Sequence, residues 1–203
     1  DLSLVVGGFG VVFAFGLFLC TGMIYACIKF LQEWATWLTV VNYTLFGIAS
    51  GFFFATAFSA FVAPELVRFF AYWAVIFLAA VFVTRVASLI RNARLKPKST
   101  LQTAIGVRHT QIQQKAQGFM GGSFNTREFF HGKSVSFMRA VKPAFLVLAF
   151  ALPVVLLALG RGAPSAGVLA LAFVVQYVGL LAERWFFFAQ ANHPQNLYYQ
   201  AIA

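Results

Sequence analysis

Six polar or titratable residues at the ends of apolar segments form the set most suited to chemistry in this sequence. Three of them recur every four residues, so a continuing helix would stack them on one face. The other three close the last apolar segment and enter the C-terminal tail. The six are Tyr25, Lys29 and Glu33 in the first group, and Glu183, Arg184 and His193 in the second.

If these two groups meet in space, they form a polar pocket with aromatic walls. Such a pocket suits a quinone head group, which needs hydrogen-bond donors for two carbonyl oxygens and a titratable group that moves protons. The alternative interpretation is that the charged side chains only reach toward the membrane interface and pair with one another.

Several other kinds of chemistry are disfavoured by where the remaining residues fall. A bis-His haem needs axial imidazoles on spanning helices, whereas His109 and His131 lie in a polar loop. Cys20 and Cys27 lack the spacing of a zinc or Fe–S site and are expected to be small buried side chains. We therefore expect no haem and no metal in this chain. A proton-driven carrier would place acids at mid-membrane depth, and here the acids lie at segment ends.

The composition is that of a membrane protein. Hydrophobic residues make up 61% of the chain and charged residues 10%, against roughly 25% charged in a soluble domain. We expect an all-α, polytopic integral membrane helix bundle with about five transmembrane helices and one long folded basic loop. Each of five largely apolar runs approaches the 20 or so residues that cross a bilayer, the third being interrupted by Arg85 near its end. The expected spans are about 4–24, 42–63, 67–90, 143–160 and 165–189.

These spans divide the chain into four parts. Residues 1–90 hold the first three helices, 91–142 the basic loop, 143–190 the last two helices and 191–203 the tail. The loop region carries ten of the fifteen Lys and Arg residues against one acid, Glu128. Because Lys/Arg-rich loops normally stay in the cytoplasm, we expect the loop and tail to face that side of a bacterial inner membrane, which the chain crosses several times.

The net charge of +10 would suggest nucleic acid in a soluble protein. Here it is concentrated beside the membrane, so lipid head groups or an acidic protein are the expected partners, and nucleic acid is not. The loop also contains several Phe and Gly residues, which is typical of a folded loop that contacts a partner. A ladder of small residues, Gly47, Gly51, Ala55 and Ser59, is expected to pack within the chain rather than to form a dimer interface.

Three strings resemble the membrane anchor subunit of dimethyl sulfoxide reductase. They are STLQTAIGVRHTQIQQKAQGFMGGSFNTREFFHG at 99–132, TGMIYACIKFLQEW at 21–34 and AERWFFFAQANHPQNLYY at 182–199. The resemblance implies an anchor that passes electrons between menaquinol or ubiquinol and a partner Fe–S subunit in anaerobic respiration. A molybdopterin catalytic subunit would complete the complex. It also implies that Arg127, Glu128, Phe129 and His131 lie on a folded loop that docks a partner.

Family anchors have about eight helices, with about three before the point where this sequence begins. Those helices hold a His-Leu-Gly segment associated with quinol handling, and this chain has no such string. We therefore expect the chain to be a C-terminal portion. The leading hypothesis is a quinol-oxidising subunit that is not catalytic alone, with Fe–S and molybdopterin in its partners. The alternative is a stand-alone polytopic carrier or assembly factor whose basic loop recruits a soluble protein.

Overall fold

The computed structural model describes residues 2–96, 98, 100–113, 133–162 and 165–191. Within them the chain forms helices and no strand, and five helical segments are long and apolar enough to cross a membrane. This confirms the predicted all-α membrane bundle with five spans. The helices are α1 (Leu2–Ala26), α2 (Trp37–Val62), α3 (Val67–Ala93), the run of α5 (Val135–Leu146), η3 (Val147–Ala151) and α6 (Leu152–Gly162), and α7 (Ala166–Ala189).

Hydroxyl side chains cap the N-termini of three of these helices. Thr36 accepts a hydrogen bond at the start of α2, Ser134 at the start of α5 and Ser165 at the start of α7, which satisfies amides that have no partner inside the helix. Between α2 and α3 a single 3-10 turn, η1 (Pro64–Leu66), reverses the chain. Because Pro has no amide hydrogen and a fixed φ, it suits the first position of such a turn.

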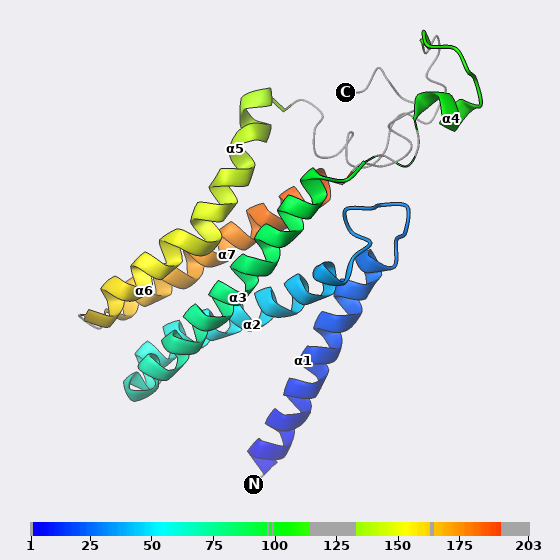
Figure 1. Cartoon of the computed structure of the whole chain (residues 1–203). Coiled ribbons are helices and arrows are strands. Elements are labelled where there is room, and N and C mark those ends of the chain that lie inside the picture. Colours follow the sequence, from blue (N-terminus) through cyan, green and yellow to red (C-terminus); the bar gives the residue numbers. More distant parts are fainter. Residues whose placement is uncertain (1, 97, 99, 114–132, 163–164, 192–203) are drawn as a thin grey trace.

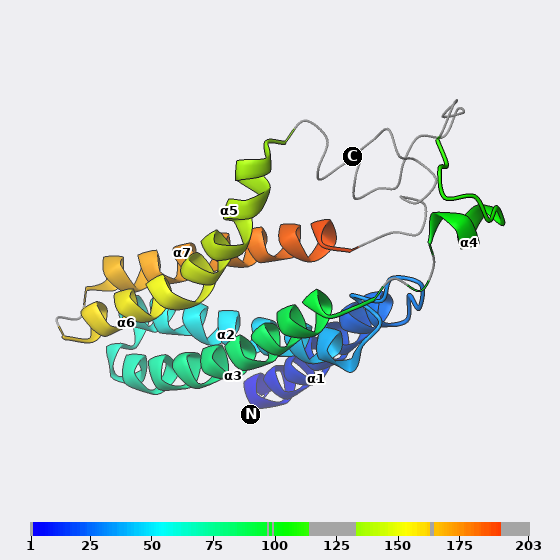
Figure 2. The same ribbon diagram turned by 45° about the horizontal axis from the view of Figure 1, so that its top comes forward.

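The helices run alternately up and down, and two hairpins make up most of the bundle. Figure 1 shows α2 lying along α3, and the α5–α6 run lying along α7, while α1 spreads away from the others toward its N-terminus. The turned view in Figure 2 shows α6 and α7 stacked over α2 and α3. We call the end of the bundle where α1, α3 and α7 finish the basic end, because the basic loop leaves from it.

The core is built from small side chains between large ones. Ala49, Ala74, Ala149 and Ala172 are completely buried, and Phe145 is buried with them. Small residues let helix backbones approach closely, which is the main source of packing energy between helices in lipid. The core therefore lies between α2, α3, the π segment η3 and α7.

The fourth membrane segment differs from the one expected from the sequence. The sequence predicts a span from residue 143, whereas the apolar span begins at Arg139, and the helix that contains it begins at Val135 and continues through Pro143. Pro143 cannot donate the usual bond within the helix, and η3 follows as a turn of π-helix. A Cβ atom built on Gly179 of α7 would overlap the backbone of Ala149, so Gly179 permits the close contact with this wider turn.

The ladder of small residues on α2 lies within the chain's own fold at two of its four positions. Gly47 faces the ring of Phe18 on α1, and Ser59 is buried. Farther from the basic end α1 and α2 diverge, and a Cβ atom built on Gly51 would meet no other part of the chain within 4 Å. Gly47, Gly51 and Ala55 line an apolar groove of about 700 Å³ between α1, α2 and α3.

A short part of the basic loop is helical. Helix α4 (Leu101–Ile105) begins with a capping box between Thr100 and Thr103, and it ends at Gly106, whose φ of 71° lies in the left-handed region that favours glycine. The prediction that the whole loop is folded extends to 114–132, which lies outside the described residues.

Candidate functional site

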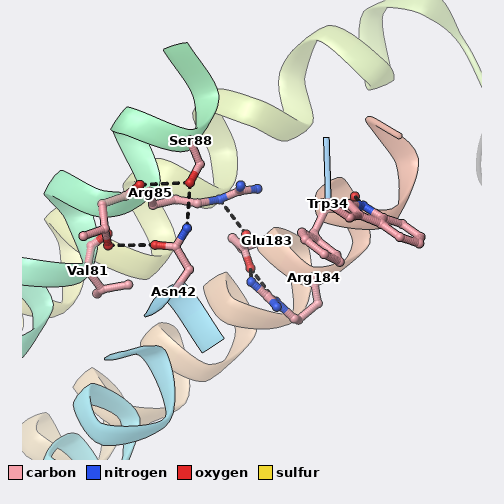
Figure 3. A network of polar contacts seen from close by, with 9 residues as sticks. Trp34, Asn42, Val81, Arg85, Ser88, Glu183 and Arg184 are labelled. Atoms are coloured by element: carbon pink, nitrogen blue, oxygen red, sulfur yellow. Dashed lines mark hydrogen bonds and ion pairs between the residues drawn. The ribbon is translucent and has the colours of Figure 1, made fainter. Parts of the chain in front are cut away.

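A buried cluster of three charged side chains joins α3 to α7 near the basic end. Arg85 Nε lies 2.7 Å from Glu183 Oε1, and Arg184 Nε donates to Glu183 Oε2 at 2.6 Å. Arg184 Nη2 also contacts that second oxygen. Each oxygen of the Glu183 carboxylate is therefore held by a different guanidinium, as Figure 3 shows.

The cluster is largely buried and carries excess positive charge. The side chain of Glu183 is 0% exposed, that of Arg85 3% and that of Arg184 20%. Two guanidinium cations share one carboxylate, so the group has a formal charge of +1. Burying a charge is costly unless it is paired and hydrogen-bonded. A site of this kind attracts a negatively polarised atom.

Aromatic rings compensate part of that charge. The Arg184 guanidinium carbon lies 4.2 Å from the centre of the Tyr43 ring and 4.9 Å from that of Phe187. Arg85 lies over Phe145 at 5.8 Å. The negative face of an aromatic ring attracts a cation, more strongly where water is excluded.

Uncharged polar side chains continue the network between α2 and α3. Asn42 Nδ2 donates to Ser88 Oγ at 2.8 Å, and Thr84 Oγ1 donates to Asn42 Oδ1 at 2.7 Å. Thr84 and Ser88 are four residues apart, so a helix places both on one face. Asn42 lies near the start of α2, and Thr84, Arg85 and Ser88 lie near the end of α3, so the antiparallel helices bring these side chains together near the basic end.

The segment between α1 and α2, residues 27–36, closes over the cluster as a strap. The indole nitrogen of Trp34 donates to the carbonyl of Phe187 at 3.0 Å, and Thr39 Oγ1 donates to the carbonyl of Trp34 at 2.7 Å. Both terminal nitrogens of Arg91 donate to the carbonyl of Gln32 at 3.1 Å. These bonds tie the strap to α7, α2 and α3.

Tyr25, at the end of α1, anchors an aromatic cluster under the strap. Its ring stacks on Tyr43 at 5.5 Å and meets Trp34, Phe187 and Phe188 edge-on at 5.3 to 5.5 Å. Edge-to-face and offset-stacked pairs of this kind stabilise a specific arrangement of rings. The same Tyr43 and Phe187 rings also face Arg184. These two rings therefore contact both the aromatic cluster and the charged cluster.

A cavity of about 10 Å³ lies where the strap meets the charged cluster. Two of its lining residues, Arg85 and Arg184, each keep one buried nitrogen, Nη2 and Nη1, without a hydrogen-bond partner among the described residues. The cavity is lined by Glu33, Thr39, Asn42, Tyr43, Arg85, Ser88, Asn92, Arg184 and Phe187.

The structure brings together four of the six predicted pocket residues. Glu33 and Arg184 line this cavity, Glu183 holds Arg184, and Tyr25 stacks on the Tyr43 wall. The prediction that a continuing helix stacks residues 25, 29 and 33 is wrong, because α1 ends at Ala26. The contacts of the strap with α3 and α7 outweigh the local tendency to continue the helix.

Lys29 lies apart from the cluster. Its side chain is exposed and lines a separate cavity of about 620 Å³ beside Cys27 and Trp37. The expectation that Cys20 and Cys27 are buried is also wrong, because both are exposed on the outer side of α1 and its end. His193 and the predicted docking residues Arg127, Glu128, Phe129 and His131 lie outside the described residues.

Sequence reasoning missed Arg85, which interrupts the third span near its end, and it missed Asn42, Thr84 and Ser88 as well. A signal existed, since Arg85 is a charged residue within an apolar span and charges at such depth are normally paired. The described residues contain no group of three His, Cys, Asp or Glu that would hold a metal ion.

Over all 203 residues the chain is 54% identical to a protein from Allochromatium vinosum that is named as a subunit of sulfite dehydrogenase. The chain spans 62% of the length of that protein. No family model matches the sequence, and no solved structure matches it. This helical membrane chain is thus similar, along its whole length, to part of a sulfite dehydrogenase subunit.

Proposed function

We propose that this chain is part of a membrane subunit of an oxidoreductase complex, and that it passes electrons between the membrane quinone pool and a partner Fe–S subunit. The observation that carries the proposal is the buried Arg85–Glu183–Arg184 cluster beside Glu33 and an aromatic wall. The name of the similar protein, a dehydrogenase subunit, supports membership of such a complex.

The finer parts of the proposal follow the resemblance to the dimethyl sulfoxide reductase anchor. A molybdopterin subunit would carry out the substrate reaction, and an Fe–S subunit would carry electrons to or from the membrane. The complex would sit in a bacterial inner membrane, with the basic loop on the cytoplasmic side. Menaquinone or ubiquinone would be the substrate of the membrane subunit.

The direction of electron flow follows from the type of enzyme. A dehydrogenase withdraws electrons from its substrate, so the name of the similar protein favours flow from the Fe–S partner toward quinone. Reduction of quinone to quinol takes up two electrons and two protons. The same groups serve the reverse reaction, in which quinol gives up both.

The two carboxylates of the site suit different roles. Both oxygens of Glu183 are already held by guanidinium groups, so neither is free to contact a ligand, and Glu183 is poorly placed to exchange a proton with one. Glu33 makes no ion pair with another described residue, and it is only partly buried on the strap near the aqueous side. Glu33 is therefore the better proton donor and acceptor, and Glu183 the residue that positions the arginines.

The test is a purification of the assembled complex in gentle detergent, followed by mass spectrometry and low-temperature electron paramagnetic resonance. The proposal expects a molybdopterin subunit and an Fe–S subunit with the chain, and cluster signals that change when a quinone-site inhibitor is added. A polypeptide that purifies alone, without clusters, would contradict it and favour the carrier or assembly-factor alternative.

A further inference from the structure

The small cavity at the charged cluster has the donors of a binding site. Arg85 and Arg184 both line it, and each has a buried nitrogen without a hydrogen-bond partner among the described residues. Figure 3 shows the terminal nitrogens of Arg85 pointing away from Glu183, while Nε makes the contact with the carboxylate. Since buried N–H groups are almost always paired, these nitrogens indicate an occupant that accepts hydrogen bonds.

The size of the cavity limits that occupant. A volume of about 10 Å³ is close to that of one water-sized probe. An aromatic ring or a phosphate group is too large, but one oxygen atom that projects from a ring fits. The rest of the ligand must remain outside the cavity.

The positive charge of the site favours binding of an oxygen that carries negative charge. Arginine is always protonated and donates only, and the cluster has an excess of one positive charge after pairing with Glu183. An oxygen that becomes negative during a reaction is therefore held more strongly than a neutral one. Fixed donors aimed at developing charge are the usual means of stabilising an oxyanion.

We propose that this cavity receives one carbonyl oxygen of bound quinone, and that Arg85 and Arg184 stabilise the negative charge that this oxygen gains on reduction. This inference rests on the proposed function. The residues that hold the oxygen would then come from α3 and α7, and the residue that protonates it, Glu33, from the strap.

Electrons and protons balance in this reduction. Two electrons from the partner Fe–S subunit enter the quinone, and the oxygen in the cavity takes the negative charge. Protonated Glu33 gives its proton to this oxygen, so the Glu33 O–H bond breaks and the quinol O–H bond forms. The second oxygen takes its proton from solvent, and solvent then reprotonates Glu33.

The inference is tested by comparing two inhibitors of the purified complex. One is an alkyl-hydroxyquinoline N-oxide, whose N–O oxygen is negatively polarised, and the other is the same molecule without that oxygen. In the natural complex the N-oxide is expected to bind about tenfold or more tightly than its partner compound, because hydrogen bonds to charged donors are among the strongest.

Substitutions test whether Arg85 and Arg184 are the residues that cause the tighter binding of the N-oxide. Arg85→Lys keeps the positive charge beside Glu183 but removes the free guanidinium donor, and it is expected to lower the preference severalfold. Arg184→Lys should also lower the preference for the N-oxide severalfold. It provides a second, independent measurement if the Arg85→Lys complex assembles poorly. The matched control is Arg94→Lys, an exposed arginine at the end of α3 away from the cavity, which should leave the preference unchanged.

The binding results distinguish failure of the proposed oxygen site from failure of the proposed quinone function. Equal binding of the two compounds by the natural complex would overturn the oxygen site while leaving the quinone function in place. An unchanged preference in assembled Arg85→Lys and Arg184→Lys complexes would also overturn it. Failure of both compounds to bind the natural complex would instead count against the proposed function itself.

Discussion

Arg85 Nε lies 2.7 Å from Glu183 Oε1, so an ion pair between α3 and α7 is buried where neither side chain reaches the surface. The two residues are almost one hundred positions apart in the sequence. Arg184 holds the other oxygen of the same carboxylate. Glu183 is therefore the shared partner of two cations, and this asymmetry determines which substitutions should be most damaging.

Glu183→Gln should destabilise the folded chain more than Arg85→Gln does. Loss of the Glu183 charge leaves two neighbouring guanidinium groups buried without an anion, at a cost of about 3–5 kcal/mol. Loss of Arg85 leaves the Glu183–Arg184 pair intact. Thermal unfolding of the complex in detergent measures the order of the two effects, and an Arg85→Gln protein that unfolds at the lower temperature would contradict this account.

Gly179→Ala should weaken the packing of α7 against the π segment. The added methyl group would overlap the backbone of Ala149, and overpacking of this kind costs about 1–3 kcal/mol. The matched control is Gly51→Ala, because a Cβ at Gly51 has no neighbour within 4 Å. The two variants are compared by unfolding midpoint in detergent, and equal midpoints would show that the contact does not constrain α7.

Trp34→Phe should loosen the strap without emptying the aromatic cluster. The substitution keeps a ring but removes the 3.0 Å hydrogen bond from the indole nitrogen to Phe187, which is worth about 1 kcal/mol. Amide hydrogen exchange in residues 28–36 should become faster by about fivefold. Trp37→Phe is the control, since that side chain is 70% exposed. Faster exchange in both variants alike would argue against a specific role for the Trp34 bond.

Glu33→Gln should slow quinone turnover by about 10²-fold or more while the complex still assembles, because positioned acid–base groups typically contribute that much. The control is Glu65→Gln, an exposed acid in the turn at the opposite end of the bundle. Steady-state rates with a soluble quinone analogue measure the effect. Equal rates in the two variants would remove Glu33 from the proton path.

The fold could be predicted from the sequence because long uncharged runs have few alternatives to spanning helices in a membrane. The five predicted spans lie within a few residues of the observed apolar spans, and the largest difference among them is the start of α2, Trp37 rather than residue 42. The helix that contains the fourth span begins earlier still, at Val135 rather than at residue 143. The inward faces were harder to predict, because these helices are apolar on all sides. Buried polar residues such as Asn42, Arg85 and Gln176 were the available signal for them.

The candidate site was predicted in part. Glu183 and Arg184 stood out as charges at the end of an apolar span, and the aromatic wall could be expected from the residues around them. The path of the strap could not, because it depends on tertiary bonds from Trp34 and Arg91 to carbonyl groups of distant segments. Those bonds end the helix after Ala26 and separate Lys29 from Glu33.

The central claim, that this chain binds quinone at the basic end of α2, α3 and α7, is tested most directly by photolabelling the complex with an azidoquinone. Peptide mapping by mass spectrometry should find the label in the strap or in the first turns of α2 and the last turns of α7, including Tyr43 or Phe187. Excess unlabelled quinone should prevent this labelling. Competable label found only outside this chain would contradict the claim.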